Sequence, residues 1–199
     1  MALEEAKANR LPTLFIPHGG GPCFFMKWSM GPPDTWDRMA AWLRSLKGRY
    51  AGAKAILVVS AHWEEAVVTV QTNEHPPLFF DYYGFPPHTY ELKWPAPGSP
   101  TLARRVQDLL ASASIESREE GERGFDHGVF VPLKVAFPTP SLPTIQLSLH
   151  ASLDAAAHLA IGRALSPLRD EGVLIVGSGM SFHNMQAMMN PGSSLEQSC

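Results

Sequence analysis

Three histidines of the sequence stand in the same local context, just after a short apolar run. They are His18 in the motif PHGGGP, His62 in SAHW and His183 in SGMSFHN. Neutral imidazole is a common metal ligand, and a few imidazoles about 2 Å from one point make a metal site. A lone histidine is more often a surface residue or a hydrogen-bonded core residue, but three in equivalent places favour a shared site. The pattern therefore predicts that His18, His62 and His183 bind a metal.

A fourth histidine, His127, lies in the motif GFDHG, before an apolar stretch. A histidine held in a turn beside a metal is suited to donating or accepting a proton, so we expect a catalytic role for His127. Asp126 is predicted to cap a short helix there. Cys23, five residues after His18, is either a further ligand or a buried thiol, and the buried thiol is the commoner case. The remaining histidines have no comparable context.

Predicted strands and helices alternate along the chain. The strands are residues 11–17, 55–60, 67–71, 143–149 and 173–177. The run 55–60 is apolar throughout and is expected to be central, whereas 67–71 alternates and is expected to be more exposed and nearer an edge. This order is typical of an α/β fold: a single domain with a central mixed, mainly parallel sheet flanked by helices. Because parallel strands end at the same edge, we expect the metal site at the C-terminal edge of the strands.

Three helices are predicted from apolar periodicity. The first has its apolar face between Trp36 and Leu46 behind an N-cap at Asp34, and the second begins at Ser99 and Pro100 and ends near Ala113. The third covers residues 152–170, where Pro167 is expected to kink or shorten it. All three should pack on the sheet.

A long segment, residues 73–100, is dense in prolines and aromatic residues. Long ordered loops are often pocket walls, and the flat rings here would suit an aromatic ligand. Alternatively, the rings attach the loop to the core. The sequence favours neither interpretation.

Composition narrows the class of partner. The chain has 199 residues, a formal net charge of −3 and 45% hydrophobic residues, with no apolar run long enough to cross a membrane. We therefore expect a cytoplasmic protein that binds a small molecule rather than a nucleic acid or a membrane. The oligomeric state is not indicated.

Taken together, the motifs resemble those of the DOPA-dioxygenase group of the LigB-type extradiol dioxygenases. The shared motifs, in family order from about residue 11 to residue 184, are PHGGGP, SAHW, GFP, WPAPGSP, GFDHG and SGxxxHN. The resemblance implies a mixed α/β fold and cleavage of a catechol, such as 3,4-dihydroxyphenylalanine, with molecular oxygen. It also implies that His18, His62 and His183 belong to the metal site and that His127 contacts substrate or transfers protons. His183 is either a ligand or a catalytic base.

One divalent metal ion per chain is expected. Zinc suits a histidine-rich site but has no accessible redox change, so we expect Zn(2+) as a bound species and Fe(2+) for turnover. The resemblance further implies that family members continue beyond the SGxxxHN motif with another ligand. Residues 1–199 are thus expected to form one incomplete dioxygenase domain, with 185–199 a divergent tail. The alternative is a non-catalytic metal-binding or interaction protein on the same scaffold.

An esterase is a weaker rival interpretation. The sequence HGGG at His18 looks like an oxyanion-hole motif of lipases. That chemistry also needs a serine in the pattern G-x-S-x-G, and no serine in the sequence has it.

Overall fold

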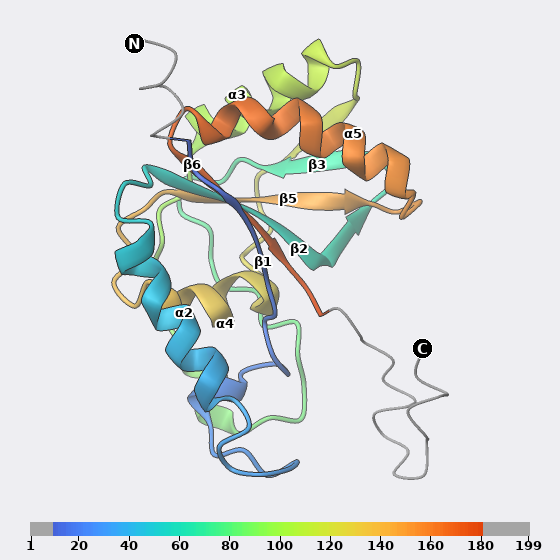
Figure 1. Cartoon of the computed structure of the whole chain (residues 1–199). Coiled ribbons are helices and arrows are strands. Elements are labelled where there is room, and N and C mark those ends of the chain that lie inside the picture. The colour runs from blue at the N-terminus through green and yellow to red at the C-terminus, as the bar shows by residue number, and fades with distance from the viewer. Residues whose placement is uncertain (1–9, 181–199) are drawn as a thin grey trace, which may run out of the picture.

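The strands of the chain form one mixed sheet, described by a computed structural model for residues 10–180 (Figure 1). Within this range the sheet has six strands in the order β1-β6-β2-β5-β3-β4. They are β1 (Thr13–Ile16), β2 (Ala55–Glu65), β3 (Val68–Gln71), β4 (Ser117–Glu120), β5 (Thr144–His150) and β6 (Val173–Ser178). All neighbouring pairs are parallel except β3 and β5. The predicted fold class, a mainly parallel α/β domain, is confirmed.

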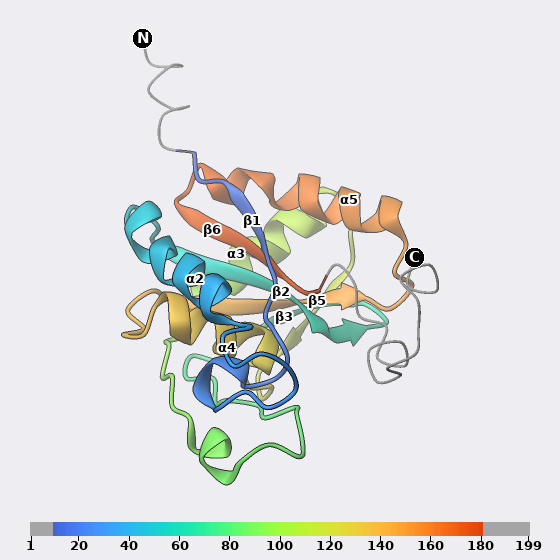
Figure 2. The ribbon, with the colours of Figure 1, turned by 60° about the horizontal axis from the view of Figure 1, so that its bottom comes forward.

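Two helices cover each face of the sheet. The α-helices of the described part are α2 (Asp37–Arg49), α3 (Pro100–Ser112), α4 (His127–Ala136) and α5 (Ala155–Leu165). In Figures 1 and 2, α3 and α5 lie on one side of the sheet and α2 and α4 on the other. We call these the α3/α5 face and the α2/α4 face. Each face has its own apolar core. Because side chains alternate across a strand, Leu57 of β2 lies in the core of the α3/α5 face, whereas Ile56 and Val58 lie in the core of the α2/α4 face.

Several helix ends follow the local signals in the sequence. The Ser99 side chain accepts a hydrogen bond from the Leu102 backbone N–H, Pro100 occupies the first turn, and α3 ends before Ala113, as predicted. The third predicted helix is shortened as expected: α5 ends at Leu165, and a 3-10 turn (Ser166–Arg169) containing Pro167 follows.

Two predicted features of this part of the fold are wrong. Asp34 does not cap α2, which begins at Asp37 with Trp36 in the N-cap position and no side-chain cap. Strand β3 is buried at all four positions rather than partly exposed. Its Val68 and Val70 side chains belong to the core of the α3/α5 face. The polar strand β4, which its sequence did not indicate, pairs along the outer side of β3 and forms the sheet edge, so β3 is nearer an edge than β2, as predicted.

Strand β2 is longer than predicted and irregular. Val59 pairs with Leu147 of β5, but the next pair is Glu64 with Leu149, so extra residues of β2 bulge out between them. Pairing of β2 with β6 stops at Ser60. The segment that carries His62 therefore leaves the flat sheet while still belonging to the strand, which is visible as the bend of β2 in Figure 1.

No helix within residues 10–180 is both long and apolar enough to cross a membrane.

Candidate metal centre

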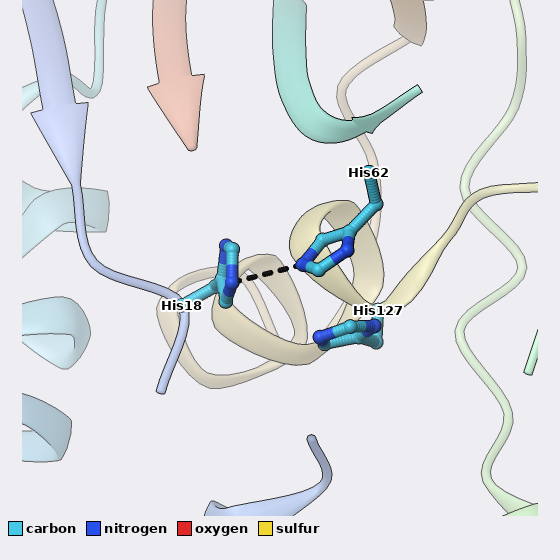
Figure 3. A group of neighbouring side chains, drawn as sticks. All are labelled: His18, His62 and His127. Atoms are coloured by element: carbon cyan, nitrogen blue, oxygen red, sulfur yellow. Dashed lines mark hydrogen bonds between the residues drawn. The ribbon is translucent and has the colours of Figure 1, made fainter. Parts of the chain in front are cut away.

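The structure places His18 in a tight turn immediately after β1 (Figure 3). Gly19 and Gly21 have φ angles of +80° and +55°, a region that side chains other than glycine rarely adopt. A Cβ at Gly21 would also lie 2.8 Å from the ring of Phe85. His18, at the start of this turn, is buried and only 1% exposed.

His62 lies in the bulge of β2, and its backbone is held from the side. The Arg123 guanidinium donates a hydrogen bond to the His62 carbonyl at 3.2 Å and contacts Asp126 at 3.4 Å. The same guanidinium stacks 4.9 Å from the Trp63 ring and 5.0 Å from the Phe79 ring. These contacts fix a segment that ordinary strand pairing leaves out of register.

His127 is the first residue of α4 and is buried. Asp126 precedes it in the N-cap position, but its side chain makes no hydrogen bond to the helix, so the predicted capping role is wrong. The buried Asp126 carboxylate instead accepts hydrogen bonds from Ser60 at 2.7 Å and from Gln146. Two hydrogen-bond donors to the carboxylate therefore lie on strands β2 and β5, whereas its own helix provides none.

His18, His62 and His127 converge on one point at the C-terminal ends of β1, β6 and β2. One ring nitrogen from each lies within 4.8 Å of the others. The Nε2 atoms of His18 and His62 are 3.0 Å apart, and the rings of His62 and His127 lie 4.0 Å apart between centroids. Figure 3 shows that each ring comes from a different segment: the turn after β1, the bulge of β2 and the start of α4.

In His18 and His127, the ring nitrogen Nδ1 forms a hydrogen bond with a neighbouring side chain, and this bond fixes the tautomer of each ring. Ser178 donates its hydroxyl proton to the Gly128 carbonyl, so at 3.2 Å it must accept from His18 Nδ1. His127 Nδ1 lies 2.8 Å from the Asp81 carboxylate, which can only accept. Both rings therefore carry the proton on Nδ1, which leaves Nε2 as the unprotonated nitrogen that faces the cluster.

This donor set fits a divalent metal ion. Two ligand nitrogens about 2.0–2.1 Å from a metal, at angles between 90° and tetrahedral, lie about 2.8–3.4 Å apart. The 3.0 Å between the His18 and His62 Nε2 atoms falls within that range and also suits a shared proton. A carboxylate that accepts from the second ring nitrogen, as Asp81 does at His127, is a usual support of metal-binding histidines. The residues present can thus hold such an ion.

Asp81 is a site residue that the sequence reasoning missed. Its Oδ1 accepts from the His127 backbone N–H at 2.9 Å and from His127 Nδ1, and its Oδ2 lies 3.9 Å from His62 Nδ1. Burial by itself would raise the pKa of the Asp81 carboxyl, but the hydrogen bonds that it accepts from the His127 side chain and backbone help to lower the pKa below its usual value. Asp81 is the one acidic residue in the aromatic stretch from Leu78 to Tyr83, which was the available signal.

The aromatic loop mainly attaches itself to the core. Tyr82 is buried, packs against Phe85, Tyr90 and Phe130, and donates its hydroxyl proton to the Thr89 carbonyl at 2.6 Å. This arrangement matches the second of the two interpretations of the loop. The loop nevertheless reaches the site, through Asp81 and through Phe85 against Gly21.

The remaining candidates are placed as follows. His183 lies outside the described residues. Cys23 is a buried free thiol, as the commoner interpretation held, and burial raises its pKa to about 12. His75, His88, His150 and His158, to which no role was assigned, lie outside the histidine cluster.

The fold and the site together define a class of protein: an α/β domain with a histidine cluster, able to hold a metal ion, where its parallel strands end. Residues 13–196 match the family described as the catalytic LigB subunit of aromatic ring-opening dioxygenase. The chain therefore belongs to the LigB family, as the resemblance of its motifs predicted.

Curated relatives carry related names. The chain is 47% identical over 131 residues to the 4,5-DOPA dioxygenase extradiol of Beta vulgaris, covering 65% of this chain and 49% of that protein. It is 37% identical over 187 residues to the protein of the same name from Escherichia coli K12, covering 94% and 65%. It is 40% identical to the dioxygenase tasH of Hapsidospora irregularis, covering 92% and 58%. The chain thus spans about half to two thirds of the length of these relatives.

A solved structure shares the fold. The crystal structure of an uncharacterized protein from Escherichia coli K12 superposes with a TM-score of 0.68 at 34% identity, covering 89% of this chain and 63% of that one.

Proposed function

We propose that the protein is a metal-dependent extradiol dioxygenase that opens the ring of a catechol with molecular oxygen. In this reaction the ring bond beside the two hydroxyl-bearing carbons breaks, and both oxygen atoms enter the product, which ends in an aldehyde and a carboxylic acid. The observation that carries the proposal is the paired His18 and His62 Nε2 atoms, 3.0 Å apart, with His127 beside them. Membership of the LigB family supports it.

His18 and His62 would hold the metal, and His183 remains a predicted ligand or base. A bound Fe(2+) would relay electrons from the catechol to oxygen, which Zn(2+) would not do because it has no accessible redox change. We therefore propose Fe(2+) for turnover, and Zn(2+) as an ion that the same imidazoles accept. The catechol class follows from the names of the relatives, including 4,5-DOPA dioxygenase extradiol, and the preferred catechol is part of the proposal.

His127 would act as the base that accepts a proton from the substrate. With its Nδ1–H donated to Asp81, its Nε2 can accept a proton from a substrate hydroxyl placed beside it. The imidazolium formed in that step would be stabilised by the Asp81 carboxylate, 2.8 Å away, as in other histidine–carboxylate pairs. The buried setting of His127 strengthens that attraction because little water screens it.

Metal content and turnover together test the proposal. The wild-type chain should bind about one Fe(2+) or Zn(2+), and His62→Ala should lose it, whereas His75→Ala, at an exposed histidine, should not. With Fe(2+) under air, the wild type should convert a catechol to a coloured ring-opened product, and His127→Ala should keep its metal but lose turnover by about 10²–10⁴-fold. Metal binding without any turnover would support the non-catalytic alternative instead.

A further inference from the structure

Asp81 is held rigidly beside the histidine cluster by backbone bonds. The Phe79 N–H donates to the Phe125 carbonyl at 2.8 Å, and the Phe125 N–H donates to the Pro77 carbonyl at 2.9 Å. These bonds tie the loop to the segment that leads directly into α4. Gly124 permits this pairing, because a Cβ there would lie 2.5 Å from the Pro77 carbonyl oxygen. Asp81 itself donates its backbone N–H to the Phe79 carbonyl at 3.0 Å.

The Asp81 carboxylate takes the place that Asp126 leaves vacant at the start of α4. Its Oδ1 accepts the first N–H of the helix, at His127, where an anion is favoured by the helix dipole. The same oxygen accepts from the ring of that residue. One atom thus fixes both the backbone and the imidazole of His127.

The second oxygen faces another member of the cluster. Asp81 Oδ2 lies 3.9 Å from His62 Nδ1, which is an ion-pair distance rather than a hydrogen bond. One oxygen of Asp81 therefore faces Nδ1 of His127 and the other faces Nδ1 of His62. The rings of these two histidines lie 4.0 Å apart between centroids.

We infer that Asp81 is the positioning residue of this site, which selects the Nδ1–H tautomer of His127 and aims its Nε2 at the point shared with His18 and His62. The inference rests on the proposed function in one respect only, the use of that Nε2 for metal or substrate. Without an acceptor at position 81, no group described around His127 Nδ1 would hold the proton there. Asp81 also makes the aromatic loop part of the site, where the Tyr82 ring lies edge-on to the His127 ring at 5.9 Å between centroids.

The test compares Asp81→Ala, Asp81→Asn and a control, Asp108→Asn, at an exposed carboxylate on α3. Imidazole nitrogen chemical shifts of the metal-free protein report the tautomer directly. The wild type, Asp81→Asn and Asp108→Asn should show His127 with its proton on Nδ1, because an amide oxygen can still accept. Asp81→Ala should lose that preference.

Zn(2+) affinity, measured by chelator competition, gives the second readout. Because Asp81 Oδ2 lies 3.9 Å behind Nδ1 of His62, a proposed ligand, Asp81→Ala should weaken this affinity about 100-fold and Asp81→Asn about 10-fold, in line with the effect of removing partners that orient metal ligands. Asp108→Asn should match the wild type. If Asp81→Ala does not fold, the Zn(2+) affinity of Asp81→Asn alone tests the inference. Wild-type affinity in Asp81→Asn, or an unchanged tautomer in folded Asp81→Ala, would overturn the inference.

The tautomer measurement needs neither metal nor catechol, so it is independent of turnover. A chain that shows the expected tautomers and affinities but opens no catechol ring would refute the proposed function and leave the role of Asp81 intact.

Discussion

The two faces of the sheet are built from the same strands but differ in chemistry. On β5, Ile145 and Leu147 enter the apolar core of the α3/α5 face, whereas Thr144 and Gln146, also buried, point to the α2/α4 face. On β2 and β6 the α2/α4 face is apolar at first and becomes polar at its end, at Ser60 and Ser178. Alternation along a strand therefore lets one sheet supply stability on one side and side-chain hydrogen bonds for a site on the other.

The polar side is a continuous support for the histidines. Ser178 holds His18, and Ser60 and Gln146 hold Asp126, whose partner Arg123 holds the backbone of His62. Buried polar groups are costly unless they are paired, so this layer gives up hydrophobic burial in exchange for fixed positions. Substitutions on the two faces should therefore separate stability from metal binding.

The largest expected effect on stability comes from the α3/α5 face. Leu147→Ala empties a fully buried position and should lower the free energy of unfolding by about 2–5 kcal/mol. The folded protein should still bind Zn(2+) with wild-type affinity, because Leu147 points away from the histidines. Denaturant unfolding and Zn(2+) competition measure the two quantities. A clear loss of affinity in the folded variant would contradict the separation of the faces.

A substitution in the polar layer should affect both quantities. Asp126→Asn keeps the shape of the side chain but presents an amide group where Gln146 donates, and it weakens the contact with Arg123. We expect a loss of about 1–3 kcal/mol in unfolding free energy, from buried groups left unpaired. Zn(2+) affinity should fall as well, because Arg123 anchors the His62 backbone. Wild-type affinity in this variant would show that the layer is merely structural.

Two helical glycines, one on each face, give a matched pair of smaller effects. Gly162 of α5 has nothing within 4 Å of an added Cβ, so Gly162→Ala should stabilise the protein by about 1 kcal/mol. At Gly128 of α4 the Cβ would lie 2.6 Å from Ser60 Oγ and 3.1 Å from His62 Cδ2. Gly128→Ala should therefore destabilise by at least about 1 kcal/mol and weaken Zn(2+) binding. Thermal unfolding and metal titration test the pair, and shifts of the same sign would contradict it.

The smallest effect concerns reactivity alone. Burial raises the pKa of Cys23 from 9.0 to about 12, so at pH 8 the native protein should hold on the order of a thousand-fold less thiolate there than an ordinary cysteine. Alkylation followed by peptide mass mapping should show Cys23 protected in the native state and labelled after unfolding. Rapid labelling of the native protein would mean that the turn around His18 opens readily.

Local signals in the sequence were sufficient for much of the fold. The apolar run 55–60 is the central part of β2, Ser99 and Pro100 start α3, and Pro167 ends α5, because each depends on burial or backbone geometry that nearby residues decide. Strand β4 was missed because its sequence, SREE, is polar and pairs only as a sheet edge. Asp34 and Asp126 look like helix caps, but one lies too far from its helix and the other is bound by the sheet.

The sequence by itself determined that histidines follow the strands, and so placed His18 and His62 at one edge of the sheet. Only the tertiary structure decided that His127 reaches them from the first turn of α4, that β2 bulges at His62, and that Asp81 lies behind the cluster. The reason is physical: a strand end is a local property of apolar periodicity, whereas the Asp81–His127 contact joins residues 46 positions apart through a loop whose path depends on how its rings pack.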